Sequence, residues 1–402
     1  MLKINKLFSN LLVIFLLFNS LYSQIPLFKY YPELNNKLSH VTLGQYPTSI
    51  INAQNLAKNL NIKNLYIKDD GYIDSRNIPT GNKMRKLEFL LADAINKNYK
   101  TICTVGGAGS NHALETLVLA KSLGLDVVLM LDDQLSTSSV IRNLKLMVNY
   151  GAKILYIDPI YDTSEKIENY VKDFCDKNNY YFIPVGGSNE IGCMGFVNAA
   201  FELKEQLKVL NMQEPDIIYV TLGSAGTAAG LIVGAKLAGL KSKIIPVRIS
   251  MTPEYKSNIL CELINKINIY IKNLGNNFII TQASVENNQV KYLDLDIEIK
   301  HDFAGPEYAF ITQQAASAVN LLNNFENIKL ESTYTGKTLA ALVNDANNNL
   351  LKDKNVLFWN TFSHDNFDKL TNNVTEDMLN SCIPVQMQHY LTDKLQELDP
   401  GL

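Results

Sequence analysis

The stretch TGNKMRKLEFLLADA, residues 80–94, decides the fold of this chain. Its first residues form turns, and the pattern that follows predicts a helix over Met84–Asn96. Lys83 therefore lies near a helix start, where the helix dipole opposes a positive charge. A lysine with a lowered pKa suits an amine that must form a Schiff base, whereas a surface lysine is the simpler interpretation. The rest of the chain decides between the two.

The composition indicates a soluble globular protein with a substantial core. The chain has 402 residues, enough for two interlocked domains, and 47% of them are hydrophobic and 19% charged. Its formal net charge of -3 gives no electrostatic reason to expect a nucleic-acid partner. The five cysteines lack the spacing of a disulfide framework or a metal site, so we expect no bound metal.

The N-terminal segment is typical of a secretory signal peptide. Lys3 and Lys6 precede the apolar run Leu11–Phe18, and the small residue Ser23 follows. The run is too short for a membrane span, which needs ~20 residues. We therefore expect residues 1–23 to be removed and the protein to be exported (periplasmic or secreted) without a stable membrane span. The alternative is a membrane anchor formed by an uncleaved N-terminal segment.

From about Leu65 onward, short β-branched or aromatic runs alternate with helical patterns, which indicates an α/β protein with parallel sheets. The expected strands are Thr101–Val105, Asp126–Leu131, Lys153–Ile157, Tyr180–Val185, Ile217–Thr221, Ile244–Arg248 and Val356–Asn360. The further expected helices are His112–Leu123, Ser164–Cys175, Gly195–Leu207, Thr227–Ala238, Thr312–Leu322 and Lys337–Asn347.

Three glycine-bearing loops, Gly106–Asn111, Gly186–Asn189 and Gly223–Thr227, each lead from an expected strand toward a helix. In open α/β sheets, ligands gather at the carboxyl ends of strands, where such loops lie. Free backbone N–H groups and the positive end of a helix dipole let each loop hold an anion, although a single loop of this kind is usually only a tight turn. Three of them together favour one shared phosphate-bearing ligand.

Six segments of the chain, in order, carry a resemblance to one enzyme family. They are GNKMRKLEFLLADA (81–94), VGGAGSNHA (105–113), IPVGGSNEIGCMGF (183–196), LGSAGTAAG (222–230), AGPEYAF (304–310) and TYTGKTLAAL (333–342). They resemble the 1-aminocyclopropane-1-carboxylate (ACC) deaminase/D-cysteine desulfhydrase family, whose members use pyridoxal 5'-phosphate (PLP). The resemblance covers roughly residues 45 to 365, and ordered motifs at compatible spacing are specific.

The resemblance implies fold type II, the tryptophan-synthase-β-like group. This is an α/β fold of two domains, each a mostly parallel twisted sheet flanked by helices. We expect a large PLP-binding domain of residues 24–90 and 205–402, with a small α/β domain, residues 91–204, inserted into it. We also expect a small amino acid as substrate and a homodimer.

The resemblance also implies roles for single residues. Lys83 resembles the Schiff-base lysine, and Lys86 a phosphate contact, with a surface ion pair as the alternative for Lys86. Ser110 and Asn111 resemble the pair near the substrate carboxylate and the 3′-oxygen of the cofactor. His112 resembles a substrate-binding histidine, and an ordinary helix-start histidine is an equally good interpretation.

Two tyrosines are singled out by their motifs. Tyr334 resembles the tyrosine stacked on the pyridine ring, and Tyr308 one that lines the substrate pocket. Together with Lys83 and Ser110, they are the expected catalytic residues. The phosphate of the cofactor is expected in a cup that consists of Gly223, Ser224, Ala225, Gly226 and Thr227.

Departures from the family pattern bear on the substrate. Gly109 stands where the family often has glutamine, and Trp359–His364 matches a His-Thr-Gly-Gly stretch of desulfhydrases only at Thr361, an expected substrate contact. Thr335, expected beside the pyridine nitrogen, stands where ACC deaminases carry an acidic residue. A neutral hydroxyl makes a shallower electron sink, which favours expulsion of a good leaving group.

The sequence therefore predicts a PLP-dependent lyase that converts D-cysteine to pyruvate, sulfide and ammonia by β-elimination and deamination. ACC deaminase is the first alternative, and a lyase of D-serine or another β-substituted D-amino acid is the second. An alternative of another class is an inactive, exported binding protein with the PLP fold. The intact Lys83, Lys86, Ser110, Asn111 and Tyr334 argue against it, because drift would spoil these residues first.

Overall fold

The computed structural model describes residues 25–73, 78–275, 282–363, 367–399 and 401. The predicted signal peptide, residues 1–23, lies outside the described residues. Among the helices of the described part, none is both long and apolar enough to cross a membrane.

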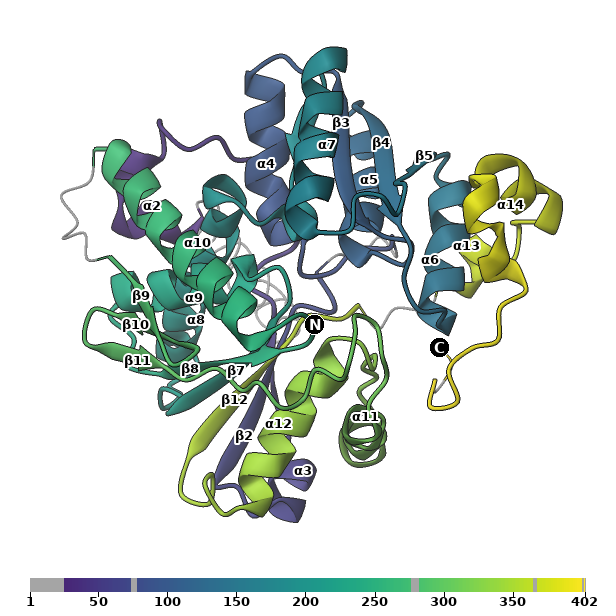
Figure 1. Ribbon diagram of the computed structural model, residues 1–402. Coiled ribbons are helices and arrows are strands. Elements are labelled where there is room, and N and C mark those ends of the chain that lie inside the picture. Colours follow the sequence, from purple (N-terminus) through teal and green to yellow (C-terminus); the bar gives the residue numbers. More distant parts are fainter. Residues whose placement is uncertain (1–24, 74–77, 276–281, 364–366, 400, 402) are drawn as a thin grey trace, which may run out of the picture.

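Two sheets form the framework (Figure 1). The larger sheet has the order β1-β2-β12-β7-β8 and is parallel except for its antiparallel edge strand β1. Its strands are β1 (Ser49–Asn52), β2 (Asn64–Asp69), β7 (Ile217–Leu222), β8 (Lys243–Arg248) and β12 (Asn355–Asn360). The smaller sheet has the order β5-β4-β3-β6 and is parallel throughout. Its strands are β3 (Thr101–Gly107), β4 (Asp126–Asp132), β5 (Lys153–Tyr156) and β6 (Tyr181–Ile183).

The predicted α/β class with mostly parallel sheets is confirmed, and all seven expected strands are present within a few residues of their expected ends. A short antiparallel sheet was not predicted; its strands are β9 (Ser284–Glu286), β10 (Gln289–Tyr292) and β11 (Leu295–Ile297). The expected division into domains at residues 90/91 and 204/205 stays a prediction.

Helices cover both faces of each sheet. One face of the larger sheet packs against α2 (Pro26–Tyr30), α8 (Glu190–Val209), α9 (Gly226–Ala238) and α10 (Pro253–Asn273). Its other face packs against α3 (Gln54–Asn59), α11 (Gln313–Glu326) and α12 (Thr335–Asn347). The smaller sheet packs against α4 (Met84–Asn96), α5 (Asn111–Ser122) and α6 (Ser138–Asn149) on one side and α7 (Ser164–Asn178) on the other. Short helices complete the chain: η1 (Pro32–Leu34), η2 (Val185–Gly187), α13 (Asp368–Thr371), α14 (Glu376–Cys382) and η3 (Val385–Leu391).

Helix α4 lies between the two halves of the molecule. Its Phe89 belongs to the core of the larger sheet, whereas Leu87 and Leu90 belong to the core of the smaller one. A helix that is apolar on two sides must bury both, which explains why almost all its residues are buried. The first turn of α4 is therefore held where the two sheets meet.

The C-terminal segment packs on the smaller sheet and then reaches the larger half. Met387 and Tyr390 share the core of α5 and α6. Further along, Gln396 accepts a hydrogen bond from the backbone N–H of Ile311 and donates one to the carbonyl of Ala309, both at 3.0 Å. The tail, residues 385–399, thus connects the two halves next to Tyr308.

Candidate active site

Lys83 immediately precedes α4, as the sequence predicted, and its amine donates to Asn82 Oδ1 at 2.9 Å. Burial lowers the pKa of Lys83, although the carboxylates of Glu115 and Glu331 act in the opposite direction. Desolvation is therefore the main cause of the lowered pKa that the sequence suggested from the helix dipole. The side-chain N–H groups of Asn82 are buried and have no hydrogen-bond partner among the described residues.

A buried ion network fixes the first turn of α4. Arg85 is almost fully buried and makes a two-bond contact with Asp70 at 2.8 and 2.7 Å, and a second with Glu202 at 2.9 and 3.0 Å. Lys68 also donates to Glu202, at 2.6 Å. Two cations thus balance two carboxylates, which a buried network requires. The network joins α4 to β2 and α8 and so holds Lys83 and Lys86 in place.

Lys86, one turn beyond Lys83, is fully buried but forms no ion pair with the described residues. Its amine donates to the carbonyl of Gly186 at 2.9 Å and to Ser188 Oγ at 3.0 Å. Burial is the main cause that lowers the pKa of Lys86 to about 7, and the neighbouring positive charge of Lys83 contributes to this shift. A surface ion pair, the alternative that the sequence left open, is therefore wrong for Lys86.

The start of α9 lies against this amine. Ala225 precedes the helix in a left-handed conformation (φ 67°), and no side chain of its own caps the helix. A Cβ at Gly226 would come within 2.5 Å of Ser188 Oγ and 2.7 Å of Lys86 Nζ, so only glycine permits this approach. Ser224 Oγ bonds Ser188 Oγ at 2.8 Å. An open helix start, two hydroxyls and a buried amine together suit a phosphate group.

The rest of the predicted cup lies on either side of Ala225 and Gly226. Thr227, in the first turn of α9, is buried. Gly223 follows the end of β7, and its carbonyl accepts from Lys256 Nζ at 2.6 Å. Burial lowers the pKa of Lys256 to about 8. This second buried amine was missed by the sequence analysis because its helix, α10, was not predicted.

Ser110 and Asn111 lie at the start of α5. Ser110 Oγ accepts from the backbone N–H of Ala113 at 3.2 Å and so caps the helix. Asn111 Oδ1 accepts from Asn143 Nδ2 at 2.7 Å, and the same amide donates to the carbonyl of Gly109 at 2.8 Å. Asn143, on the unpredicted helix α6, therefore fixes the side chain that was expected beside the cofactor.

His112 is buried, and its Nε2 lies 3.0 Å from Thr104 Oγ1. Because Thr104 gives its own proton to the carbonyl of Ile183, at 2.9 Å, the histidine must donate from Nε2. Burial lowers the pKa of His112 well below its usual value, so the ring is neutral. Nδ1 is then a buried acceptor without a partner among the described residues, which leaves one nitrogen for a ligand.

Tyr308 and Tyr334 are brought together by their hydroxyl groups, which share a hydrogen bond. Their ring centroids lie 6.1 Å apart at an interplanar angle of 66°. A Cβ at Gly223 would lie 3.8 Å from the ring of Tyr334, and one at Gly107 would lie 3.3 Å from the ring of Tyr308. The pair therefore spans the space between the phosphate loop and the loop before α5. Burial raises the pKa of Tyr308 to about 12 and raises that of Tyr334 well above its usual value, so both keep their protons at neutral pH.

Thr335 is fully buried, and its hydroxyl lies 2.9 Å from a carboxylate oxygen of Glu331. Glu331 also accepts from the backbone N–H groups of Thr333 and Thr335, at 2.6 and 2.7 Å, and so caps α12. Because the hydroxyl proton is directed to Glu331, Thr335 offers another group a lone pair and not a proton. The predicted contact with the pyridine nitrogen stays a prediction. The hydroxyl is neutral, but the carboxylate of Glu331 lies one hydrogen bond away from it.

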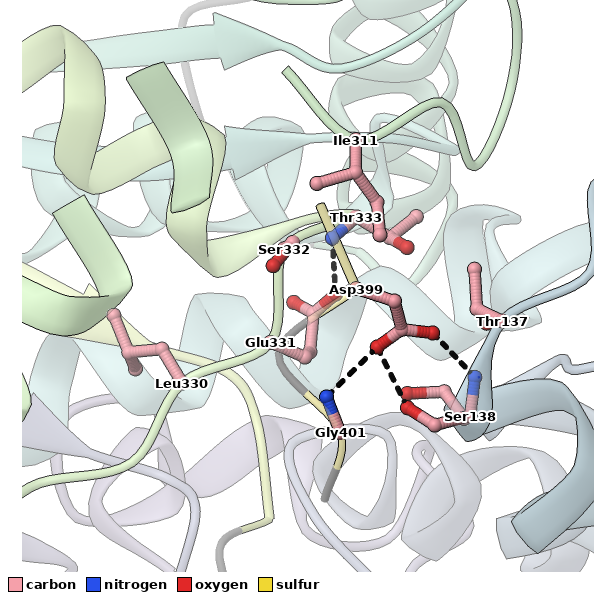
Figure 2. A pocket seen from close by; sticks show the side chains of 10 residues that line it. Thr137, Ser138, Ile311, Leu330, Glu331, Ser332, Thr333, Asp399 and Gly401 are labelled. Atoms are coloured by element: carbon pink, nitrogen blue, oxygen red, sulfur yellow. Dashed lines mark hydrogen bonds between the residues drawn. The ribbon is translucent and has the colours of Figure 1, made fainter. Parts of the chain in front are cut away.

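Figure 2 shows the outer side of Glu331, where a small pocket lies between its loop and the C-terminal tail. The carboxylate of Asp399 accepts from the backbone N–H of Ser138, at 2.5 Å, and from the hydroxyl of Ser138, at 2.8 Å. The tail thus binds the start of α6 beside the loop that caps α12.

Thr361 follows β12 and is half-buried, without a side-chain hydrogen bond to the described residues. The next residue, Phe362, is buried, and the guanidinium of Arg142 lies 5.7 Å from its ring centroid. Among the described residues, the guanidinium of Arg142 donates hydrogen bonds to Asn143 Oδ1 alone, at 3.1 Å, and forms no ion pair. Burial lowers the pKa of Arg142 to about 10, although Glu331 opposes this. Sequence reasoning missed this cation, whose position depends on the packing of α6 against the segment after β12.

These residues fit PLP. The open start of α9 with Lys86 suits its phosphate, and Lys83 offers a half-buried amine of lowered pKa to its aldehyde. The unpartnered nitrogen atoms of Asn82 and His112 supply polar groups that a bound ligand would satisfy.

Residues 41–361 match the family described as pyridoxal-phosphate dependent enzyme. The chain belongs to this family. It is 30% identical over 288 residues to a D-cysteine desulfhydrase of Klebsiella pneumoniae (strain 342), a match that covers 70% of this chain and 81% of the relative.

Two solved structures share the fold of this chain. A crystal structure of an ACC deaminase homologue superposes with a TM-score of 0.70 and 28% identity, over 86% of this chain and 98% of the other. A fungal L-serine ammonia-lyase from Rhizomucor miehei, 17% identical, superposes with a TM-score of 0.54 over 84% of this chain and 100% of the other. The chain is thus a PLP-dependent enzyme among lyases and deaminases, and the predicted cofactor is confirmed.

Proposed function

We propose that the chain catalyses β-elimination and deamination of a small amino acid, with D-cysteine as the preferred substrate. The observation that carries the proposal is the pairing of two amines one helix turn apart, the half-buried Lys83 and the fully buried Lys86. Lys83 has a lowered pKa and stands beside Asn82, and Lys86 faces the open start of α9. Lys83, the proposed covalent anchor of the cofactor, and Lys86, the proposed phosphate contact, therefore lie at a fixed spacing.

When bound, PLP supplies a sink for the electron pair of the bond that breaks at the substrate Cα. The chain itself must move the proton. Lys83 Nζ, freed by the substrate amine, accepts the Cα proton, and burial favours the neutral amine that this requires.

The substrate carboxylate is held at the start of α5. The backbone N–H groups of Asn111 and His112 point out of the helix there, and the dipole favours an anion. Asn143 fixes the side chain of Asn111, so that the substrate meets a preorganised site.

The hydroxyl groups of Tyr308 and Tyr334 close the site on the remaining side. Since both pKa values are raised, both groups are proton donors at neutral pH. A phenol that keeps its proton can donate a hydrogen bond to an expelled thiolate.

One fact supports D-cysteine over ACC: Thr335 stands where ACC deaminases carry an acidic side chain. The relatives do not separate the two substrates, because one is named a D-cysteine desulfhydrase and another, 32% identical, a putative 1-aminocyclopropane-1-carboxylate deaminase. The carboxylate of Glu331, one hydrogen bond behind Thr335, reduces this difference and keeps ACC as the first alternative. A lyase of D-serine or another β-substituted D-amino acid is the second.

The test is a comparison of substrates with the purified holoenzyme. D- and L-cysteine, D- and L-serine and ACC are supplied separately, ammonia is measured for all, and sulfide for the cysteines. We expect the highest kcat/KM with D-cysteine and none with the Lys83→Ala variant. Faster ammonia release from ACC than from D-cysteine would replace the proposal by its first alternative, and no turnover by a PLP-loaded protein would favour an inactive binding protein.

We further propose that the protein is exported and forms a homodimer. The order of basic, apolar and small residues from Lys3 to Ser23 supports export. Mass spectrometry of the native protein should find Gln24 at or near the N-terminus, and an intact Met1 on soluble protein would contradict this. Sedimentation of the holoenzyme measures the oligomeric state.

A further inference from the structure

Glu115 is a buried carboxylate next to Lys83 for which the reaction outlined above has no use. It lies on α5, one turn beyond Asn111, and only 5% of it is exposed. Its Oε2 accepts from the backbone N–H of Gly81 at 2.8 Å and of Met84 at 3.2 Å. These two residues flank Lys83, so the carboxylate closes the turn that carries the lysine.

A neutral side chain would serve this turn at lower cost. The amide oxygen of a glutamine can accept the same two hydrogen bonds, whereas a buried carboxylate without a close cation loses its solvation. Glu115 forms no ion pair within the described part of the chain. Burial accordingly raises the pKa of Glu115 to about 7, although Lys83 and the backbone N–H groups oppose this. Because burying this charge destabilises the fold, a role other than folding must explain why the residue is a carboxylate.

The charged groups around Lys83 indicate this role. The acids that act on it are Glu115, from α5, and Glu331, from the loop before α12. Lys86, on the same helix, repels its positive charge, and the neutral ring of His112 adds none. Glu331 accepts hydrogen bonds from residues at the start of α12, including Thr335. Glu115, in contrast, accepts hydrogen bonds from the turn that contains Lys83.

We propose that Glu115 is a positioning residue for Lys83, which holds the lysine turn and stabilises the positively charged form of the lysine nitrogen. When the Cα–H bond of the substrate breaks, its electron pair passes to the cofactor sink and its proton forms a new N–H bond on Lys83. The negative charge of Glu115 keeps that proton on Lys83 until it is passed on. The inference rests on the assignment of Lys83 as the anchor in the proposed function.

The test is Glu115→Gln, which keeps the acceptor and removes the charge. The pH titration of the cofactor absorbance in the holoenzyme reports protonation of the nitrogen that joins Lys83 to PLP. We expect its midpoint to fall by about 1 pH unit or more, the effect of losing a nearby opposite charge. The pH profile of kcat should shift in the same direction, with KM little changed.

Glu88→Gln is the matched control. Glu88 is equally buried on α4 and accepts from the backbone N–H groups of Leu43 and Gly44, at 2.8 and 3.1 Å, but it is not among the acids that act on Lys83. Its titration midpoint should equal that of the wild type. A Glu115→Gln variant that keeps the wild-type midpoint would overturn the inference.

A second pair of variants covers a fold that does not tolerate glutamine. Glu115→Asp and Glu115→Asn both lose reach, but only the aspartate keeps the charge, so its midpoint should be the higher of the two; equal midpoints would contradict the proposal. Borohydride trapping separates the two hypotheses. If Lys83→Ala still traps PLP on another lysine, the anchor assignment fails, whereas an unshifted Glu115→Gln with trapping on Lys83 overturns the role of Glu115 alone.

Discussion

Replacing Lys86 by Met should raise the stability of the apoenzyme and weaken cofactor binding at the same time. The fall of the Lys86 pKa from 10.5 to about 7 corresponds to a cost of roughly 5 kcal/mol for burying the charge. The variant avoids this cost but loses two hydrogen bonds, worth ~1 kcal/mol each. We therefore expect the apoenzyme variant to be more stable at pH 7 by about 1–3 kcal/mol.

The pH dependence has a definite sign. Between pH 7 and 10.5, the unfolded chain binds a proton at Lys86 that the folded apoenzyme does not. The contribution of this residue to the stability of the wild-type apoenzyme therefore rises with pH over that window, and the Met variant lacks this rise. Denaturant unfolding of apoenzyme at pH 7 and at pH 9 measures the difference.

Cofactor binding should change in the opposite direction. A charge-assisted hydrogen bond to phosphate is worth ~1.5–3 kcal/mol, so PLP should bind the variant about 10- to 100-fold more weakly. Equilibrium titration of apoenzyme followed by absorbance gives this Kd. Pyridoxal, which lacks the phosphate, should bind both proteins equally.

Lys97→Met is the control, since Lys97 is exposed at the other end of α4 and pairs with Asp93. It should change neither the stability nor the Kd appreciably. The reasoning is refuted if Lys86→Met destabilises the apoenzyme, or if PLP and pyridoxal lose affinity to the same extent.

Three further changes test the site. Lys83→Ala should abolish the absorbance of the covalently held cofactor and leave the circular dichroism spectrum unchanged; an imine still trapped by borohydride would contradict this. Gly226→Ala should crowd Lys86 Nζ, 2.7 Å from the new Cβ, and weaken PLP more than pyridoxal in the same titration. Thr335→Glu should place a second carboxylate against Glu331 in a buried position and lower the free energy of unfolding by about 3 kcal/mol or more, measured with urea; an unchanged midpoint would show that the two side chains separate.

The parts of the fold that follow from local patterns were predictable. Apolar β-branched runs predicted the strands of both sheets, and the turn before Met84 predicted α4 with its observed ends. Helices α6 and α10 were missed although the sequence carries signals for them: Val140, Leu144 and Met147 recur at helical spacing in α6, and Thr137 and Thr252 cap the two helices.

The site divides in the same way. Lys83 and Lys86 lie in one short segment and the expected phosphate loop, Gly223–Thr227, in another, so each motif could be recognised by itself. Glu115 contacts a turn 31 to 34 residues earlier in the chain, and nothing in its own surroundings in the sequence indicates that contact. The position of Thr335 was expected from its motif, but the carboxylate of Glu331 behind it became visible only in the structure.

Substitutions in the C-terminal tail could change substrate preference although the tail lies outside the catalytic motifs. The family match ends at residue 361, yet Gln396 binds the backbone on both sides of Phe310, next to Tyr308. Substitutions in residues 385–399 can therefore move Tyr308, the predicted pocket residue, without altering any of the predicted cofactor contacts. The accepted amino acid can therefore change in evolution through substitutions in a segment without catalytic residues. Enzymes with identical catalytic motifs can then differ in substrate.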